Sequence, residues 1–306
     1  MTLRAHKGIW PSLLTPVAAD GEIRHDLLAA HAKNLLALGC NGVTLFGTTG
    51  EGPSFSVSER TAALSALIAA GVPADAILVH TSAAALPDTI ALSVHATQLG
   101  VHACLLMPPF FFKGVSDEGI TAALQQVIDA VKQDRLSLRA VLYHIPQVAG
   151  VGLSAAVIRA LVDRNPGVIL GIKDSACDRA HSLGLAQAFM TEVQVWVGNE
   201  LDIPALAAKG TNGAVSGVAN IMPRCVMRLV ENRDVKSIDS DLKRAGAYID
   251  LLNATVMLPT FKATMAILTG ESDWARVRAP LRQLSDTEVT LVRERLQVVG
   301  ITDFTS

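Results

Sequence analysis

The sequence is poor in the residue patterns that mark metal-binding and disulfide-rich proteins. Its cysteines are scattered and form no CxxC pair, so neither a disulfide framework nor a zinc site is expected. They are Cys40, Cys104, Cys177 and Cys225. The histidines show no HxH or HExxH spacing, so no metal site is predicted. This cysteine usage is typical of a reducing compartment, and we expect a cytoplasmic protein.

The chain also lacks an excess of charge of one sign. It has 26 basic and 28 acidic residues among 306, with no basic stripe or cluster. Nucleic acids and anionic membranes are therefore not expected partners. Its apolar runs are interrupted well short of the length that spans a membrane. Trp10-Pro11 breaks the N-terminal apolar stretch, so no signal peptide is predicted.

Half of the residues are hydrophobic, and short β-type runs alternate with longer helical ones. The predicted strands are 8–15, 43–47, 76–81, 103–108, 139–146, 168–173, 193–198 and 213–217. These runs are apolar on both faces, as the strands of a covered parallel sheet are. Eight strand–helix units predict an α/β fold, a (β/α)8 barrel over residues 1–222. A doubly wound sheet is the alternative, but no switch point is visible.

Only helical patterns follow the last predicted strand. One helix begins at Ser285 with a capping box to Glu288, as an earlier one does at Ser56 with Glu59. No linker or low-complexity segment separates these helices from the barrel. We therefore predict that residues 223–306 form a C-terminal helical extension packed on the barrel.

Lys173 ends the apolar run VILGIK, at the carboxyl end of the sixth predicted strand. The carboxyl ends of barrel strands form the active-site face. Lysine is rarely buried, so either this side chain extends to solvent or it is kept there for chemistry. Burial disfavours the charged form of an amine, and a neutral amine can attack a ketone to form a Schiff base.

Two further groups of residues lie at predicted strand ends. The loop GTTGEG, residues 47–52, has glycines and threonines whose N–H and O–H groups suit a carboxylate. A tight strand-to-helix turn is the alternative role for this loop. Tyr143, one of two tyrosines, ends the fifth strand and suits proton transfer. Its alternative role is to fill the barrel. His144 is expected to point outward and to be structural.

Three short motifs follow predicted strands in the order in which a known family has them. GTTGE after the second strand, Y-x-I-P after the fifth and GIKDS after the sixth resemble the dihydrodipicolinate synthase/N-acetylneuraminate lyase family. The likeness covers nearly the whole chain. It implies a metal-free class I lyase or aldolase that needs no cofactor, takes pyruvate or another 2-keto acid with an aldehyde, and assembles as a homotetramer.

The resemblance also assigns roles to residues. It makes Lys173 the Schiff-base lysine and gives Thr49 and Tyr143 a place in a proton relay. It gives Thr48 and Thr49 the carboxylate of the keto acid. It further implies that the backbone of Gly198 and Val215 lines the pocket.

Two positions depart from the family pattern. Val148 stands where lysine-pathway synthases carry a carboxylate-binding arginine, and Phe112 stands where the family often has a relay tyrosine from a neighbouring subunit. We therefore expect a substrate derived from a sugar acid. A true 4-hydroxy-tetrahydrodipicolinate synthase, a 2-keto-sugar-acid dehydratase and a non-catalytic ligand-binding member remain alternatives.

Overall fold

Eight parallel strands form a ring at the centre of the molecule. The computed structural model describes residues 7–211, 213–231 and 235–301. The strands are β1 (Gly8–Pro11), β2 (Val43–Leu45), β3 (Ile77–His80), β4 (Ala103–Leu106), β5 (Ala140–His144), β6 (Ile169–Asp174), β7 (Gln194–Val197) and β8 (Gly213–Ser216). Seven of them lie within the predicted runs and are shorter than them, and β6 is shifted by one residue from its predicted run, 168–173, so the predicted fold class is confirmed.

The ring closes in the order β1-β8-β7-β6-β5-β4-β3-β2. Between β1 and β2 the contact is a single parallel bridge from Ser12 to Thr44, beside which the Leu13 N–H donates to the Thr44 carbonyl at 2.8 Å. On the opposite side, β5 pairs with β6 so that Tyr143 and Lys173 are direct partners. The predicted residues therefore meet across one strand pair.

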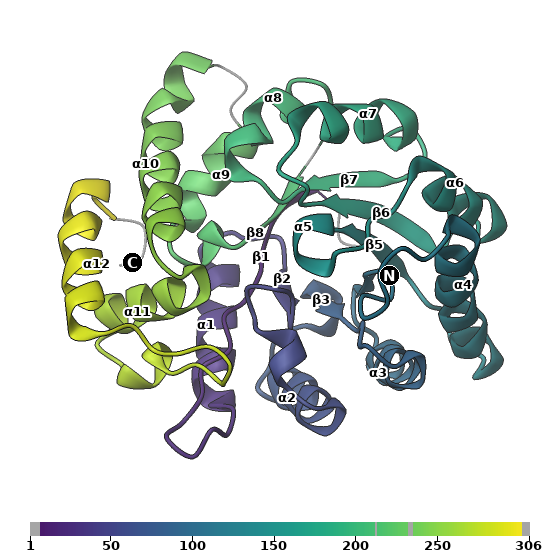
Figure 1. Cartoon of the computed structure of the whole chain (residues 1–306), viewed down its shortest axis with the longest axis horizontal. Helices are drawn as coiled ribbons and strands as arrows, with labels where there is room; N and C mark the ends of the chain where they lie inside the picture. The colour runs from purple at the N-terminus through teal and green to yellow at the C-terminus, as the bar shows by residue number, and fades with distance from the viewer. Residues whose placement is uncertain (1–6, 212, 232–234, 302–306) are drawn as a thin grey trace.

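Helices surround the ring (Figure 1). They are α1 (His25–Ala37), α2 (Val57–Ala69), α3 (Leu86–Gln98), α4 (Asp117–Gln133), α5 (Pro146–Ala149), α6 (Ala155–Arg164), α7 (Arg179–Phe189), α8 (Ile203–Ala207) and α9 (Pro223–Glu231). Both capping boxes form as predicted, at Ser56 and at Ser285. None of these described helices, nor any that follows, has the length and apolar content to cross a membrane.

The C-terminal helices gather on one side of the barrel (Figure 1). They are α10 (Val235–Ala254), α11 (Met257–Thr269) and α12 (Asp286–Val299). Helix α9 packs on β1 and β8, as a barrel helix does, and α10 packs on α9. The division between barrel and extension at residues 222 and 223 stays a prediction.

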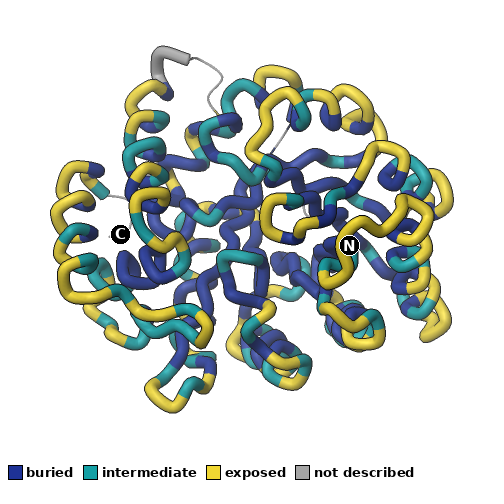
Figure 2. The backbone as a smooth tube through the Cα atoms, viewed as in Figure 1, coloured by how far each residue is buried: buried dark blue, intermediate teal, exposed yellow. Residues whose placement is uncertain are grey.

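The apolar residues form two layers. The larger layer lies between the strands and the surrounding helices. The smaller one fills the barrel and includes Trp10, Trp196, Val141, Tyr143 and Val215. The buried residues accordingly concentrate at the centre of the molecule, with exposed residues around the rim (Figure 2). These side chains fill the barrel interior. The polar candidate residues, Lys173 among them, lie at the carboxyl ends of the strands.

The seam between β8 and β1 leaves no room for a side chain at Gly213. A Cβ there would overlap the Gly8 carbonyl oxygen, whereas Gly184 in α7 has open space. We expect Gly213→Ala to lower the free energy of unfolding by about 1–3 kcal/mol. Gly184→Ala should raise it by about 0.5–1 kcal/mol, since it removes only backbone freedom. Urea unfolding measures both, and equal effects would contradict this packing of the seam.

Candidate active site

Lys173 is buried at the end of β6, with 4% of its surface exposed. Its Nζ lies 4.1 Å from the centre of the Tyr143 ring. The side chain therefore does not extend to solvent, which was the alternative for a lysine at a strand end. The face of an aromatic ring attracts an ammonium group, but it offers no proton acceptor as strong as a carboxylate. The amine is held in place by packing against this ring.

Tyr143 connects the lysine to the loop after β2. Its ring is buried in the barrel layer, and its hydroxyl lies 3.3 Å from Thr48 Oγ1, within hydrogen-bonding distance. The ring thus fills the barrel while the hydroxyl reaches the polar face. Hydroxyl groups in contact can pass a proton between them. Both roles considered for this residue are compatible with its position.

The GTTGEG loop is a compact turn. The N–H groups of Gly50 and Gly52 both donate to the Gly47 carbonyl, at 3.0 and 3.3 Å, and the Thr15 hydroxyl donates to the Gly50 carbonyl at 2.7 Å. A Cβ on Gly50 would lie 2.6 Å from the Leu13 carbonyl oxygen, so the loop requires glycine there. The tight-turn interpretation is therefore correct. It leaves the carboxylate-binding role open as well.

Thr49 lies beside the loop after β8. A Cβ placed on Gly217 would be 3.1 Å from Thr49 Oγ1. Val215, on β8, belongs to the same buried barrel layer as Tyr143. Gly198 follows β7, and its N–H donates to the Asp174 carbonyl at 2.7 Å, next to Lys173. The residues that the sequence nominated thus lie around one end of the barrel, on β5, β6 and β8 and in the loops after β2 and β7.

His80 was not identified from the sequence. It ends β3, is buried, and its ring meets the Tyr143 ring edge-on at 6.0 Å. Neither ring nitrogen makes a well-formed hydrogen bond to another described residue. Burial, followed by the positive charges of Arg60 and Lys173, lowers the pKa of His80 to about 3, while the Phe46 backbone acts in the opposite direction. A neutral imidazole therefore lies next to the tyrosine at physiological pH.

Glu200 was also missed, because nothing in its local sequence marks it. It lies in a short 3-10 turn after β7 and is buried. Its Oε1 accepts hydrogen bonds from the Ser216 hydroxyl at 2.6 Å and from the Val218 N–H at 3.2 Å. Burial raises the pKa of Glu200, while these hydrogen bonds and the charge of Lys173 lower it. A carboxyl group thus lies within the electrostatic reach of the lysine.

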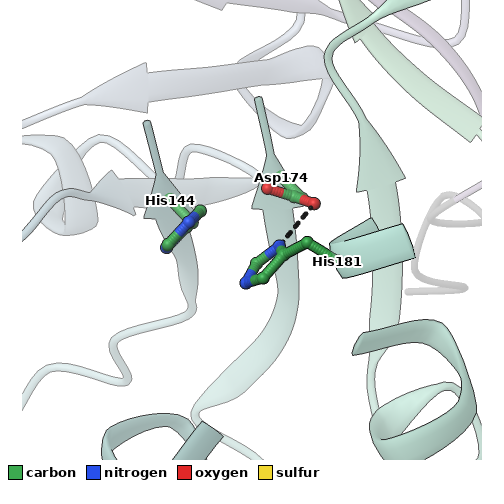
Figure 3. A group of neighbouring side chains, drawn as sticks. All are labelled: His144, Asp174 and His181. Atoms are coloured by element: carbon green, nitrogen blue, oxygen red, sulfur yellow. Dashed lines mark hydrogen bonds and ion pairs between the residues drawn. The ribbon is translucent and has the colours of Figure 1, made fainter. Parts of the chain in front are cut away.

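His144 points away from the barrel interior, as predicted. It forms a group with Asp174 and His181, between the ends of β5 and β6 and helix α7. One potential ligand atom from each lies within 4.8 Å of the others (Figure 3). The Leu153 N–H donates to His144 Nδ1 at 2.9 Å, and the two imidazoles stack at 4.5 Å.

The carboxylate of this group already has several donors. Asp174 Oδ2 accepts from the Ser182 hydroxyl at 2.6 Å and lies 3.1 Å from His181 Nδ1, while Oδ1 accepts from the Ala176 N–H at 3.1 Å. Since His144 Nδ1 is an acceptor, neutral His144 carries its proton on Nε2, the nitrogen left to face a metal. The contacts satisfy this network as a structural tie between β5, β6 and α7.

The loop after β4 forms part of the mouth. Phe111 and Phe112 are 70% and 72% exposed, and Val148 on α5 is 56% exposed. Lys113 Nζ donates to the Phe110 carbonyl and, at 2.6 Å, to the Ala149 carbonyl, which ties this loop to α5. The loop that carries Phe111 and Phe112 therefore lies against α5, the helix of Val148, and brings the cation of Lys113 with it.

Comparison with known proteins gives consistent results. The model of the dihydrodipicolinate synthetase family matches residues 5–298. An uncharacterized DapA-like lyase of Chloroflexus aurantiacus is 34% identical over 292 residues, 94% of this chain and 95% of that protein. The crystal structure of dihydrodipicolinate synthase from Agrobacterium tumefaciens superposes with a TM-score of 0.86 at 32% identity, covering 95% of this chain and 99% of that one. A 2-dehydro-3-deoxy-D-gluconate/2-dehydro-3-deoxy-phosphogluconate aldolase of Thermoproteus tenax is 27% identical, over 83% of this chain and 78% of that protein.

Proposed function

The chain belongs to the dihydrodipicolinate synthetase family, and from this membership and its site we propose that it is a Schiff-base aldolase or lyase for a 2-keto acid. The observation that carries the proposal is the buried amine of Lys173 against the Tyr143 ring, with the Tyr143 hydroxyl 3.3 Å from Thr48 Oγ1. Pyruvate or a longer 2-keto acid derived from a sugar acid is the substrate class. As the family resemblance implies, we also propose a homotetramer.

The proposed reaction begins when the neutral Lys173 amine attacks the keto carbon. Loss of one water gives an imine, whose protonated form accepts electrons from the carbon–carbon bond that breaks. The Tyr143 hydroxyl gives its proton to the imine nitrogen, so its oxygen can then take the proton of the substrate hydroxyl as the carbonyl of the released aldehyde forms. A proton then returns to the enamine carbon. One water hydrolyses the imine, so that pyruvate leaves and the amine is regenerated.

The substrate carboxylate is proposed to bind at Thr48 and Thr49. Both side chains are partly buried in a loop that hydrogen bonds hold rigid. Backbone N–H groups and hydroxyls in such a turn stabilise an anion without a cation. In this arrangement the carboxylate would sit beside Thr49, with the keto carbon directed toward Lys173.

The second substrate is proposed to be a neutral aldehyde. Val148 offers no charge at the position where lysine-pathway synthases carry their carboxylate-binding arginine. Val148, Phe111 and Phe112 present exposed apolar surface in place of that cation, so a second carboxylate gains no ion pair from them. The competing assignment is a 4-hydroxy-tetrahydrodipicolinate synthase, which the similarity to the Agrobacterium enzyme favours. In that case Lys113 is the cation best situated to replace the arginine.

Lys173 should form an imine with pyruvate. Incubation with pyruvate, reduction with borohydride and digestion should leave the added mass on the Lys173 peptide. Lys173→Arg should abolish this modification, because a guanidinium remains charged and cannot attack the ketone. An unmodified Lys173 peptide at saturating pyruvate would contradict the proposed reaction.

Tyr143→Phe should separate imine formation from turnover. The variant keeps the ring against the lysine, so borohydride trapping should persist. It loses the proton-transferring hydroxyl, so kcat for aldol cleavage should fall by about 10²–10⁴-fold. Unchanged turnover would mean that Tyr143 contributes only packing.

The choice of aldehyde distinguishes the two assignments. With saturating pyruvate, kcat/KM should be higher for neutral aldehydes than for aspartate semialdehyde of similar length. A preference for the semialdehyde of more than about tenfold, or roughly 1.4 kcal/mol, would overturn the proposed substrate class. If Lys113→Met then removed that preference, Lys113 would be the carboxylate-binding residue.

A further inference from the structure

A fully buried ion pair joins the GTTGEG loop, through its residue Glu51, to helix α11. Lys262 Nζ, on α11, donates to Glu51 Oε1 at 2.7 Å, and neither side chain has exposed surface. The two residues are separated by 211 positions in the sequence. Burial lowers the pKa of Lys262, and the charge of Glu51 opposes this shift. The pair therefore joins the C-terminal helices to the loop after β2.

A buried ion pair adds little net stability by itself. Removing two charges from water costs about as much as their attraction returns, and apolar side chains of similar volume often serve stability equally well. The second oxygen of Glu51 has no hydrogen-bond partner among the residues that the structure describes. Stability alone thus gives a weak reason for this pair, and its location suggests another.

Glu51 occupies a conformation that needs support. Its φ of 56° and ψ of 29° are left-handed, a region that side chains other than glycine enter at a cost. Its N–H donates to the Thr48 carbonyl at 3.1 Å, so the orientation of Glu51 is coupled to the threonine turn. A charge held at 2.7 Å by Lys262 fixes this residue from the other side.

Helix α11 also reaches the neighbouring loop. A Cβ placed on Gly217 would lie 3.3 Å from Phe261 Cζ and 3.1 Å from Thr49 Oγ1. Phe261 and Lys262 are consecutive, so one turn of α11 supports the loops after β8 and β2 together. The second turn of this helix is thus packed against the loop of the proposed carboxylate site.

We propose that Lys262 and Glu51 form a positioning pair, which holds the Gly47–Gly52 loop in the shape that binds the carboxylate of the keto acid. The C-terminal extension is then part of the substrate-recognition apparatus. This inference rests on the proposed function, since it assigns the loop to a carboxylate. Neither residue touches the reacting atoms.

The test measures the pyruvate concentration that gives half-maximal borohydride trapping of Lys173. In Lys262→Met this concentration should rise roughly tenfold or more, as expected when hydrogen bonds to a charged group are weakened. Trapping at saturating pyruvate should still reach completion, because Lys173 itself is unchanged. The melting temperature should fall as well, because Glu51 is left buried without its partner.

A double variant separates positioning from stability. Glu51→Met with Lys262→Met leaves no unpaired charge, so its melting temperature should recover toward that of the unaltered chain. Its half-saturating pyruvate concentration should nevertheless stay raised, because nothing orients the loop. This variant also provides the test if Lys262→Met alone does not fold. Recovery of pyruvate affinity in the double variant would overturn the proposal.

Arg228→Met is the matched control. Arg228 on α9 binds Asp241 on α10 through two hydrogen bonds of 2.7 Å, away from the GTTGEG loop. Its loss should lower the melting temperature and leave half-saturation unchanged. An equal rise in the half-saturating pyruvate concentration of Arg228→Met would mean that the effect of Lys262→Met is general destabilisation, and it would overturn the proposal.

The unaltered chain separates this inference from the proposed function. If it shows no trapping, the proposed function and this inference are both overturned. If trapping occurs and the half-saturating pyruvate concentration is unchanged in the Lys262 and Glu51 variants, this inference alone is overturned.

Discussion

The burial of the Lys173 amine against the Tyr143 ring is the constraint on which the rest of the site depends. The Lys173 Nζ lies 4.1 Å from the centre of this ring, and only 4% of the residue's surface is exposed. The pairing of β5 with β6 imposes the contact, because Tyr143 and Lys173 are register partners. The geometry of the nucleophile is thus a property of the sheet itself rather than of a mobile loop.

Hydrogen-bond donors and a carboxyl group lie on different sides of this amine. The loop after β2 offers hydroxyl and N–H donors on one side, and the buried carboxyl of Glu200 lies toward β7 and β8. His80, at the end of β3, is neutral at physiological pH and so adds no positive charge near Lys173. The loop after β4 adds the exposed rings of Phe111 and Phe112 and the cation of Lys113.

Sequence periodicity was sufficient for the barrel, because each strand lies in a short, mostly apolar run and longer helical patterns alternate with these runs. Strand ends follow from those runs, so Lys173, Tyr143 and the threonine loop could be found before any coordinates. Glu51 and Lys262 could not be paired in this way, since 211 residues separate them and only the packing of α11 brings them together. The same holds for the group of His144, Asp174 and His181, which comes from three elements and has no local spacing to reveal it. Pairings made by packed helices carry no periodic signal in the sequence.

In the proposed complex a keto acid is bonded to Lys173 and its carboxylate lies in the Gly47–Gly52 loop. A crystal structure of the protein soaked with pyruvate tests this directly. We predict continuous electron density from Lys173 Nζ to the second carbon of pyruvate, with the carboxylate oxygens within hydrogen-bonding distance of Thr48 and Thr49. Density that joins pyruvate to another lysine, or a carboxylate bound at the Lys113 side of the mouth, would contradict the account.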